Sequence, residues 1–252
     1  MIKIILVGAN GKMGSAITSN ICAADDIEII AGVDKYKGIN RDYPVFDSIN
    51  EITVKADAII DFSNPAVLDG LLAYATEKKT PAVICTTGFS PEQVAKIKTA
   101  SEQTAIFYSG NMSLGINLLI ELAKKATQVF GSAFDVEIVE KHHNQKLDAP
   151  SGTALMIADG ISEVMQQEPQ YVYDRHSYRK KREKNEIGIH AVRGGTIVGE
   201  HEVIFAGHDE VLTITHQAQS KEVFAIGSIN AAVYLKGKSS GMYDMSDMLQ
   251  GK

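Results

Sequence analysis

Cysteine is scarce in this chain, and its scarcity excludes two kinds of protein. The 252 residues contain two cysteines, Cys22 and Cys85, which lie far apart and form neither a CxxC pair nor a spacing typical of metal ligands. A disulfide-stapled fold and a paired-cysteine metal centre are therefore excluded. A reducing compartment suits such a chain, and we expect a cytoplasmic protein.

Long apolar runs are missing as well. No stretch approaches the roughly 20 apolar residues that a membrane-spanning helix needs, and the sequence contains no internal repeat. The first apolar run, Ile2–Val7, is too short for a signal peptide and ends in a glycine instead of a cleavage site. We expect neither a leader segment nor a membrane partner.

Positive charge is not in excess either. Lysines and arginines number 25 against 31 aspartates and glutamates, so the formal net charge is −6, which argues against a nucleic-acid partner. Four histidines in the C-terminal half lack any HExxH or carboxylate-triad spacing, so we expect no metal site and interpret them as structural: His190, His201, His208 and His216.

A glycine-rich turn near the N-terminus indicates a nucleotide-binding half. The strand-like run Ile2–Val7 leads into the turn 8–14 and then into apolar residues at helical spacing, which is the context of a dinucleotide fingerprint. The glycine spacing is GxxGxxG, not the standard GxGxxG. A second strand-like segment, Ile27–Val33, ends in Asp34, which can accept a hydrogen bond from the ribose 2′-hydroxyl of NADH. The adjacent Lys35 can hold the 2′-phosphate of NADPH, so the choice of cofactor stays open.

Strands and helices then alternate along the chain. Strands are predicted at 56–61, 81–85 and 105–108, and helices at 65–77 and 91–102. The alternation predicts an α/β domain with a doubly wound, parallel, Rossmann-type sheet. Ligands bind at the carboxyl ends of such strands, so the polar loops Thr86–Gly88 and Ser109–Met112 are expected to complete the rim of a cofactor cleft.

The second half of the chain reads as an α+β domain. A helix is predicted at 116–130, followed by a half-buried strand at 134–139. Segments rich in Ile, Val and Thr predict a largely antiparallel sheet, at 187–192, 196–205 and 210–216. The segment 168–186 is polar and irregular, an apolar helix is predicted at 222–235, and the tail from Lys236 shows no strong pattern.

Most of the chemistry is expected between residues 140 and 154. His142 and His143 lie at the end of a predicted strand, so their side chains point to opposite faces, and one can move a proton while the other binds or packs. Ser151 is a good N-cap, and Gly152 and Thr153 open the next helix.

A helix start of this kind suits a carboxylate ligand. The backbone N–H groups and the hydroxyls of Ser151 and Thr153 attract anions, and Lys146 adds a full positive charge. Arg193, in an Arg-Gly-Gly turn, is expected to face the same anion. Each of these residues alone is more often an ordinary core or surface side chain. Because all of them occur together around one loop, we favour a site.

Motifs from both halves resemble those of the dihydrodipicolinate reductase family. The resemblance rests on the turn Gly8–Gly14 and above all on the stretch Glu140–Ala154. Further segments also look like that family: Thr86–Gly88, Ser109–Ser113, Val198–His201 and Ser240–Met245. The resemblance implies an NADH- or NADPH-dependent oxidoreductase of lysine and diaminopimelate biosynthesis. Its substrate would be a cyclic, imine-containing dicarboxylate, 4-hydroxy-tetrahydrodipicolinate.

The resemblance also implies roles for individual residues. His142 would donate a proton to the ring carbon next to the hydride acceptor, and Lys146 would assist it. Substrate carboxylate binding maps onto His143, Lys146, Gly152 and Thr153, to which the helix-start argument adds Ser151 and Arg193. The expected cofactor contacts are Gly8, Ala9, Asn10, Gly11, Lys12, Met13, Asp34, Lys35, Thr86, Thr87, Gly88, Ser109, Gly110, Asn111 and Met112.

The two-domain form of the family implies domain limits for this chain. Residues 1–113 plus 223–252 would form the dinucleotide-binding domain, and residues 114–222 would form a substrate-binding and oligomerisation domain. Homotetramers would be built through the sheets of the second domain.

Two other functions fit the same architecture. One is a different dinucleotide-dependent reductase that acts on another carbonyl or imine acid, which the fold alone does not exclude. A nucleotide-sensing protein that has lost catalysis is the other alternative. The histidine and lysine loop speaks against a sensor, which has no need of a placed proton donor.

Overall fold

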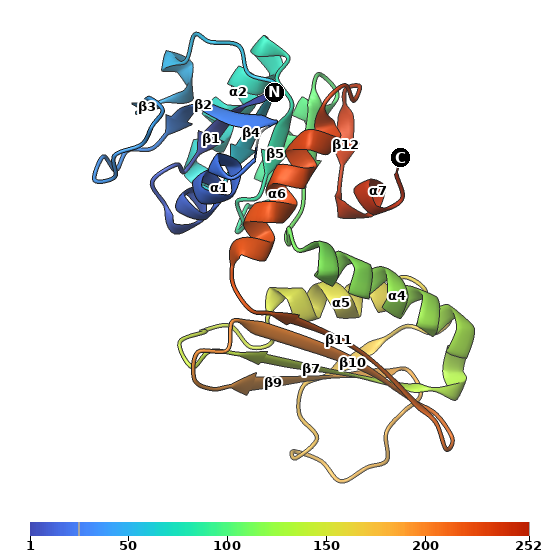
Figure 1. The fold of residues 1–252 in the computed structure, drawn as a ribbon. Helices are drawn as coiled ribbons and strands as arrows, with labels where there is room; N and C mark the ends of the chain where they lie inside the picture. The colour runs from blue at the N-terminus through green and yellow to red at the C-terminus, as the bar shows by residue number, and fades with distance from the viewer. Residues whose placement is uncertain (25, 252) are drawn as a thin grey trace. The chain divides into compact units, whose positions relative to one another are not determined.

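The computed structural model describes residues 1–24 and 26–251 as two compact units (Figure 1). The first unit comprises Met1–Ser113 with Lys221–Lys252, and the second comprises Leu114–Ser220. Each unit has its own sheet and its own hydrophobic core.

The first unit contains a seven-stranded sheet in the order β12-β6-β5-β4-β1-β2-β3, and every pairing in it is parallel. Its strands are β1 (Ile2–Val7), β2 (Ile27–Val33), β3 (Val45–Phe46), β4 (Ala58–Asp61), β5 (Ala82–Ile84), β6 (Ala105–Tyr108) and β12 (Gly241–Tyr243). The strand order reverses between β1 and β4, which is the switch point where such sheets bind dinucleotides. The predicted Rossmann-type sheet is therefore confirmed.

Five α-helices belong to the described part of the first unit. They are α1 (Lys12–Cys22), α2 (Leu68–Lys78), α3 (Pro91–Ser101), α6 (Glu222–Leu235) and α7 (Met245–Leu249). Side chains cap the starts of α3 and α7. Ser90 and Gln93 form a reciprocal capping box at the start of α3. Asn64 caps a short 3₁₀ turn, Pro65–Val67, so the helix predicted from residue 65 becomes α-helical at Leu68. A further 3₁₀ turn spans Ile49–Glu51.

The tail after Lys236 contains regular structure that its sequence pattern did not reveal. Strand β12 pairs with β6, and Asp244 caps α7 through a capping box with Asp247. The strand has three residues, too few to show a period, and its partner lies far upstream in the chain.

Alternate residues of β1 are buried on the two opposite faces of the sheet. Ile5 and Val7 belong to the cluster that includes Leu71 of α2 and Ile97 of α3. Neighbouring strand residues such as Ile4 are also fully buried and point to the other face of the sheet. A strand covered on both faces explains the apolar run at the N-terminus.

The second unit contains a five-stranded sheet in the order β11-β10-β7-β9-β8. Its strands are β7 (Asp135–His142), β8 (Gln170–Val172), β9 (Glu186–Arg193), β10 (Gly199–Ala206) and β11 (Val211–Ala218). Strand β10 runs antiparallel to β7 and β11, but β9 runs parallel to both β7 and β8. The expectation of a largely antiparallel sheet was thus half wrong. The connection from β7 to β9 contains a helix and returns the chain in the same direction.

Two helices cover one face of this sheet, as Figure 1 shows for α4 (Leu114–Phe130) and α5 (Gly152–Ser162). A Cβ at Gly160 would lie 2.8 Å from the side chain of Ile120, so this glycine lets the two helices approach closely. A 3₁₀ turn, Gly131–Ala133, ends α4. Along β7 every second side chain is buried. This face begins as apolar core with Val136 and Ile138.

The buried face of β7 then continues with two polar residues. Glu140 and His142 occupy the next inward positions and are 0% and 8% exposed. A carboxylate and an imidazole are thus held inside a hydrophobic layer, where each needs partners. The alternation of side chains along β7 therefore places Glu140 and His142 on the buried face of the sheet.

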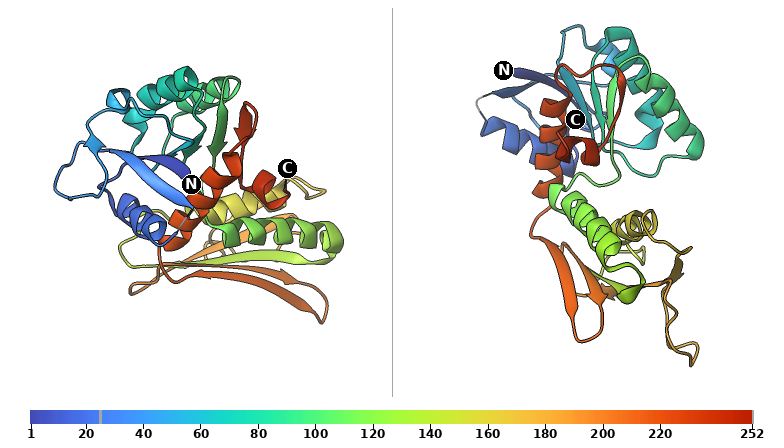
Figure 2. Two further views of the ribbon diagram at one scale, coloured as in Figure 1. Left: turned by 45° about the horizontal axis from the view of Figure 1, so that its top comes forward. Right: turned by 90° about the vertical axis from the view of Figure 1, so that its right-hand side faces the viewer.

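The segment between β8 and β9 forms a long loop (Figure 2), and its arginines bind residues on the face of the sheet opposite α4 and α5. Arg182 donates to Asp135 at 3.0 Å and to Glu137 at 3.0 Å, and Arg175 donates to Glu137 and to the buried Glu186. The polar stretch expected to be irregular therefore has two anchoring arginines.

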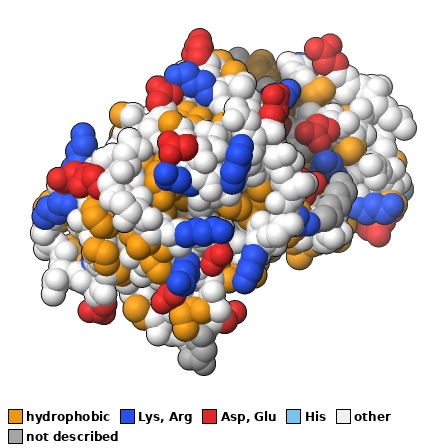
Figure 3. Space-filling model, turned by 90° about the horizontal axis from the view of Figure 1, so that it is seen from above, with side chains coloured by type: hydrophobic (Ala, Val, Ile, Leu, Met, Phe, Trp, Pro, Cys, Tyr) orange, Lys and Arg blue, Asp and Glu red, His pale blue; other side chains and the backbone are white. Residues whose placement is uncertain are grey.

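Charges on the surface are mixed. Figure 3 shows basic and acidic side chains interspersed on one face of the molecule. In the described ranges, no helix combines the length and the apolar character needed to cross a membrane.

Candidate active site

The central loop predicted from sequence joins the end of β7 to the start of α5. Ser151 caps the helix, and its Oγ accepts a hydrogen bond from the Ala154 N–H at 3.1 Å. The amide of Gly194 donates to the carbonyl of His142 at 2.9 Å, and the amide of Asn144 donates to the carbonyl of Gly195 at 3.2 Å. The Arg-Gly-Gly turn therefore holds the loop in place by backbone hydrogen bonds.

Glu140 lies at the centre of the buried polar residues. One oxygen accepts from His142 Nδ1 at 2.6 Å and from Arg193 Nη1 at 2.7 Å. The other accepts from Arg193 Nη2 at 2.7 Å and from the Ser151 N–H at 2.9 Å. Burial alone would raise the pKa of Glu140, but the hydrogen bonds from Arg193, His142 and Ser151 together lower it below its ordinary value. The carboxylate is ionised and fully bonded.

His142 has opposing influences on its charge. Burial lowers its pKa, Glu140 acts to raise it, and nearby Lys146 and Arg193 lower it further, so the net direction is downward. A Cβ at Gly199 would lie 3.1 Å from His142 Nε2, so the glycine leaves the far edge of the ring uncrowded. His142 thus has one nitrogen tied to a carboxylate and the other beside Gly199.

A second histidine, His201 of β10, stands against the first. The rings of His142 and His201 meet edge to face with centroids 5.2 Å apart, and His201 Nε2 lies 3.1 Å from Ser151 Oγ. Burial, and then repulsion from His142, lowers the pKa of His201 to about 4. This histidine is neutral near pH 7, and it packs the back of the site.

The cation of the loop is engaged by a neighbouring carboxylate. Lys146 Nζ lies 2.9 Å from Asp148 Oδ1, and this hydrogen bond lowers the pKa of Asp148. The Asp148 side chain is 57% exposed, whereas Lys146 is 21% exposed. The ammonium therefore stays in the loop, while its partner can turn away toward solvent.

The start of α5 is accessible beside these groups. Gly152 is exposed, and a Cβ built on it would meet no atom within 4 Å. Thr153 is half-buried in the first turn. His143, half-buried just beyond β7, has a buried Nδ1 that no group within residues 1–24 and 26–251 bonds.

Arg193 is bound by groups of the protein itself. Its guanidinium spans both oxygens of Glu140, and its Nη2 also donates to the carbonyl of Asp148 at 2.6 Å. The structure therefore brings Arg193 to the site through Glu140 and the loop backbone.

The glycine turn of the first unit is closely packed. Gly8 has φ +82°, and a Cβ there would lie 2.3 Å from the Phe62 carbonyl oxygen. A Cβ at Gly14 would lie 2.3 Å from the Gly8 carbonyl oxygen. Only glycine fits at these two positions, so the GxxGxxG spacing is set by contacts between backbone segments.

A cavity of about 340 Å³ opens on this turn. Four of the predicted cofactor residues line it, together with loop residues after β4: Gly8, Gly11, Asp34, Lys35, Phe62, Ser63 and Asn64. The Asp34 carboxylate accepts from the amides of Asn10 and Tyr36, both at 2.9 Å. Asp34 is thereby fixed at the cavity, while Lys35 is exposed.

The other predicted cofactor residues lie in the glycine turn, at the start of α1 and in the loops after β5 and β6. Ala9 is buried, Lys12 is exposed and Met13 is half-buried at the start of α1. Thr86 Oγ1 accepts from the Ser63 N–H at 2.9 Å, which joins the loops after β4 and β5. Thr87 and Gly88 follow and are exposed.

The loop after β6 is held by its own side chains. Ser109 Oγ donates to the carbonyl of Asn111 at 2.9 Å, and Asn111 Oδ1 accepts from the Ser113 N–H at 2.9 Å. Gly110 is exposed, and Met112 is buried next to Gly227 of α6, whose Cβ would clash with the Met112 carbonyl. These side chains therefore fix the shape of the loop.

Three residues of these sites were missed by the sequence interpretation. Glu140 was quoted in the motif but given no role, and His201 was interpreted as structural. Strand alternation could have placed Glu140 on the same face as His142, but nothing local linked His201 to them. Arg41 was also missed. It donates to the Ala9 carbonyl at 2.6 Å and to Ser15 Oγ at 2.8 Å, which fixes a cation on the glycine turn.

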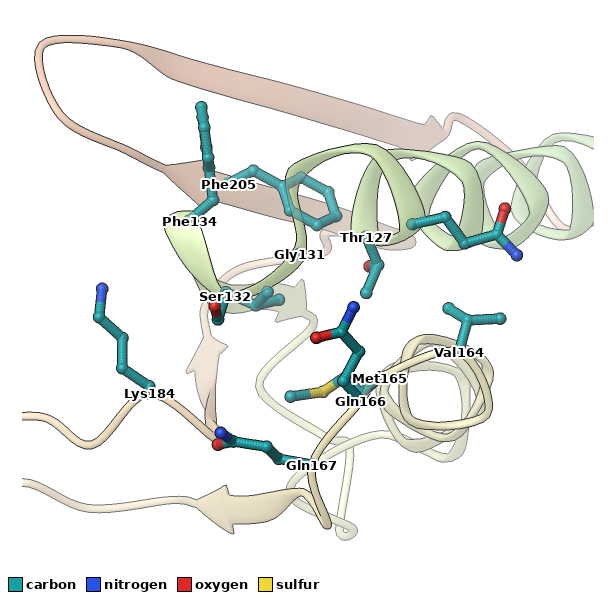
Figure 4. A pocket seen from close by; sticks show the side chains of 12 residues that line it. Thr127, Gly131, Ser132, Phe134, Val164, Met165, Gln166, Gln167, Lys184 and Phe205 are labelled. Carbon is teal, nitrogen blue, oxygen red and sulfur yellow. The ribbon is translucent and has the colours of Figure 1, made fainter.

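A separate cavity of about 180 Å³ in the second unit carries none of the predicted residues (Figure 4). It lies where α4 and α5 end, and its walls include Thr127, Phe134, Met165 and Phe205. Its one charged residue, Lys184, pairs with Asp135 at 3.4 Å. Among the described residues, no group of three His, Cys, Asp or Glu side chains is arranged to hold a metal ion.

Comparisons with known proteins identify relatives over the whole chain. The protein-family model described as "Dihydrodipicolinate reductase, N-terminus" matches residues 2–112. The family model described as "Dihydrodipicolinate reductase, C-terminus" matches residues 115–249. The 4-hydroxy-tetrahydrodipicolinate reductase of Clostridium tetani is 52% identical over 99% of this chain and 97% of its own. That of Caldanaerobacter subterraneus subsp. tengcongensis is 50% identical over 99% of both chains. The dipicolinate-bound dihydrodipicolinate reductase of Paenisporosarcina sp. TG-14 is similar in structure, with a TM-score of 0.82, 25% identity and 97% coverage of both chains.

Proposed function

The chain belongs to the dihydrodipicolinate reductase family, and from this we propose that it reduces 4-hydroxy-tetrahydrodipicolinate to tetrahydrodipicolinate with NADH or NADPH. This reaction belongs to lysine and diaminopimelate biosynthesis. The resemblance identified in the sequence agrees with both family models and with the curated relatives.

The first unit fits a nicotinamide dinucleotide. The turn at Gly8 leaves no room for a Cβ, and the cavity beside it has Asp34 and Lys35 on its wall. We assign the pyrophosphate to the amides at the start of α1 and the adenosine ribose to Asp34, with Lys35 and Arg41 as cations for a 2′-phosphate. The bound cofactor supplies the hydride.

The second unit supplies the site for the dicarboxylate. A carboxylate of the substrate fits between Lys146 and the start of α5, where Ser151, Gly152 and Thr153 lie. The buried, unbonded Nδ1 of His143 supports a further contact there. The substrate carboxylate would take the place on Lys146 that Asp148 occupies.

His142 is the proposed proton donor. Its Nδ1–H is held by Glu140, so the proton that moves is the one on Nε2. The Nε2–H bond breaks, its electron pair stays on the ring, and the proton forms a C–H bond at the substrate carbon next to the hydride acceptor. Lys146 stabilises negative charge that develops during this step.

One observation carries the proposal beyond the family relationship. A histidine hydrogen-bonded to a buried carboxylate stands next to a lysine and an accessible helix start. This arrangement can donate a proton and bind a carboxylate at one place, which a nucleotide sensor does not require.

The proposal is tested by following oxidation of NADH and NADPH in parallel. The substrate is generated in place from pyruvate and aspartate semialdehyde by the preceding enzyme. Oxidation should require both this protein and the generated substrate, and His142→Gln should lower kcat by about 100-fold or more with little change in KM. Cofactor binding without turnover would reject the proposed substrate and favour one of the two alternatives.

We propose further that the protein is a cytoplasmic homotetramer in which the first unit binds the cofactor and the second unit binds the substrate and its sister chains. The sheet of the second unit supports this role, because β11 is an edge strand whose side chains are largely exposed. Light scattering on the purified protein would measure the assembly directly.

A further inference from the structure

Glu140 is the most completely bonded side chain around the proposed proton donor. It is 0% exposed, and four donors reach its two oxygens at 2.6 to 2.9 Å, from His142, Arg193 and Ser151. A buried carboxylate is tolerated when its lone pairs are filled and a cation faces it. So many fixed contacts give its position little freedom, and His142 is bonded to it.

We propose that Glu140 is a positioning residue that fixes the tautomer and orientation of His142. An ionised carboxylate can accept hydrogen bonds but cannot donate them, so Nδ1 of His142 must carry a hydrogen. Nε2 is then the nitrogen that carries the exchangeable proton. This inference rests on the proposed function, in which His142 donates a proton. On this proposal, Glu140 orients the His142 ring for proton transfer without itself touching substrate or cofactor.

Arg193 completes the arrangement. Its two terminal nitrogens bind the two oxygens of Glu140 side by side, a planar pairing that sets the direction of the carboxylate as well as its charge. The same guanidinium donates to the Asp148 carbonyl. Arg193 thus connects the carboxylate behind His142 to the loop that carries Lys146.

Among the groups that face His142, Glu140 is the one that favours the protonated ring. Strand β7 contributes Glu140, β9 contributes Arg193, β10 contributes the neutral His201, the loop contributes Lys146, and α5 contributes the uncharged Ser151. Of these five, Glu140 alone is anionic. Removing its charge therefore leaves two cations that oppose protonation of the ring.

The first test is Glu140→Gln, which keeps the shape of the side chain and removes the charge. We expect kcat to fall about 10- to 100-fold with KM for the substrate unchanged within about twofold. Activity falls with rising pH as the imidazolium is lost. The alkaline limb of the kcat profile should therefore move to lower pH by about one unit. A purely structural role would lower kcat without moving that limb.

The matched control is Glu137→Gln, on the same strand but on its opposite face. Glu137 also accepts from a histidine, His190 Nε2 at 2.8 Å, and from Arg175 and Arg182. It therefore reproduces the loss of a Glu–His–Arg cluster away from the site. Its kcat and pH profile should match those of the wild type.

The second test needs neither turnover nor a variant. In histidine-labelled wild-type protein, the ring nitrogen shifts of neutral His142 should report a hydrogen on Nδ1 and none on Nε2. A hydrogen on Nε2 would overturn the proposal, even if Glu140→Gln fails to fold. An unchanged pH profile with kcat within twofold of the wild type would overturn it too. Because the nitrogen shifts are measured without substrate, they test Glu140 even if the protein does not reduce the proposed dicarboxylate.

Discussion

Charge at the centre of the second unit is decided residue by residue. Glu140, His142 and His201 lie in one buried layer, yet hydrogen bonds from Arg193 keep the first ionised, while burial keeps the last neutral. His142 lies between these two and has one anionic neighbour and two cationic ones. A group whose pKa is set by opposing effects of burial and neighbouring charges can change its charge during a reaction.

Asp148 pairs with the ammonium of Lys146, to which we assign a carboxylate of the substrate. Asp148→Asn removes a competing carboxylate from Lys146 and should lower KM for the dicarboxylate about two- to fivefold. An exposed ion pair contributes at most about 1 kcal/mol, which sets this range. The control is Glu163→Gln, which removes an exposed carboxylate from Lys124 on α4. A rise in KM for Asp148→Asn would show that Asp148 assists binding.

His201 should make folding sensitive to acid. Its pKa is about 4 in the folded protein against an ordinary value of 6.5, so between these values the unfolded chain binds the proton more readily. This contribution to stability is complete above pH 6.5 and declines as the pH falls toward 4. From pH 7 to pH 5 we expect a loss of about 2 kcal/mol from this residue.

Urea denaturation at both pH values measures this loss at fixed protein concentration. His201→Gln should show a smaller decrease between pH 7 and pH 5 than the wild type. His208→Gln, at a histidine side chain that is 98% exposed, is the control and should keep the wild-type dependence on pH. Equal pH slopes for all three proteins would contradict the assignment.

At the scale of elements, single glycines decide how closely segments approach. Gly8 carries φ +82° and faces the Phe62 carbonyl, so Gly8→Ala adds both backbone strain and a clash. We expect a loss of at least about 3 kcal/mol in stability and the loss of NADH binding. Thermal unfolding and fluorescence titration measure the two effects.

Gly131 provides the comparison for Gly8. It has φ +53°, but a Cβ there would meet no atom within 4 Å. Gly131→Ala should therefore lose only about 1–2 kcal/mol from the left-handed conformation and keep NADH binding. If the two variants were equally stable, the clash at Phe62 would have no energetic weight.

Elements with a strong local period were predictable, and those defined by distant partners were not. The sequence pattern located β2 and α6 at the limits the structure gives, because a strand rich in Ile and Val and an apolar helix need no outside information. Strand β12 and the direction of β9 depend on pairing with strands far away in the chain. The site divides in the same way. His142 and Lys146 share a loop motif, but Arg193 reaches Glu140 across 53 residues of sequence.

For the whole molecule, the open question is how copies of the chain assemble. The sheet of the second unit ends in β11, an edge strand of eight residues with several exposed side chains, and long edges of this kind pair with other chains unless protected. Val211 at its start is 62% exposed. If β11 lies in the tetramer interface, a lysine there places a charge among apolar contacts.

If the proposed tetramer is built through β11, Val211→Lys should shift it to smaller species in light scattering. Val129→Lys is the matched control, because Val129 is 67% exposed but lies on α4, on the helical face of the same unit. It should leave the assembly intact. Dissociation by both variants would indicate an interface that extends over the helices, and dissociation by Val129→Lys alone would move the interface from the sheet to α4. A tetramer that survives both substitutions would remove β11 from the proposed assembly, since a desolvated lysine in a packed interface costs several kcal/mol.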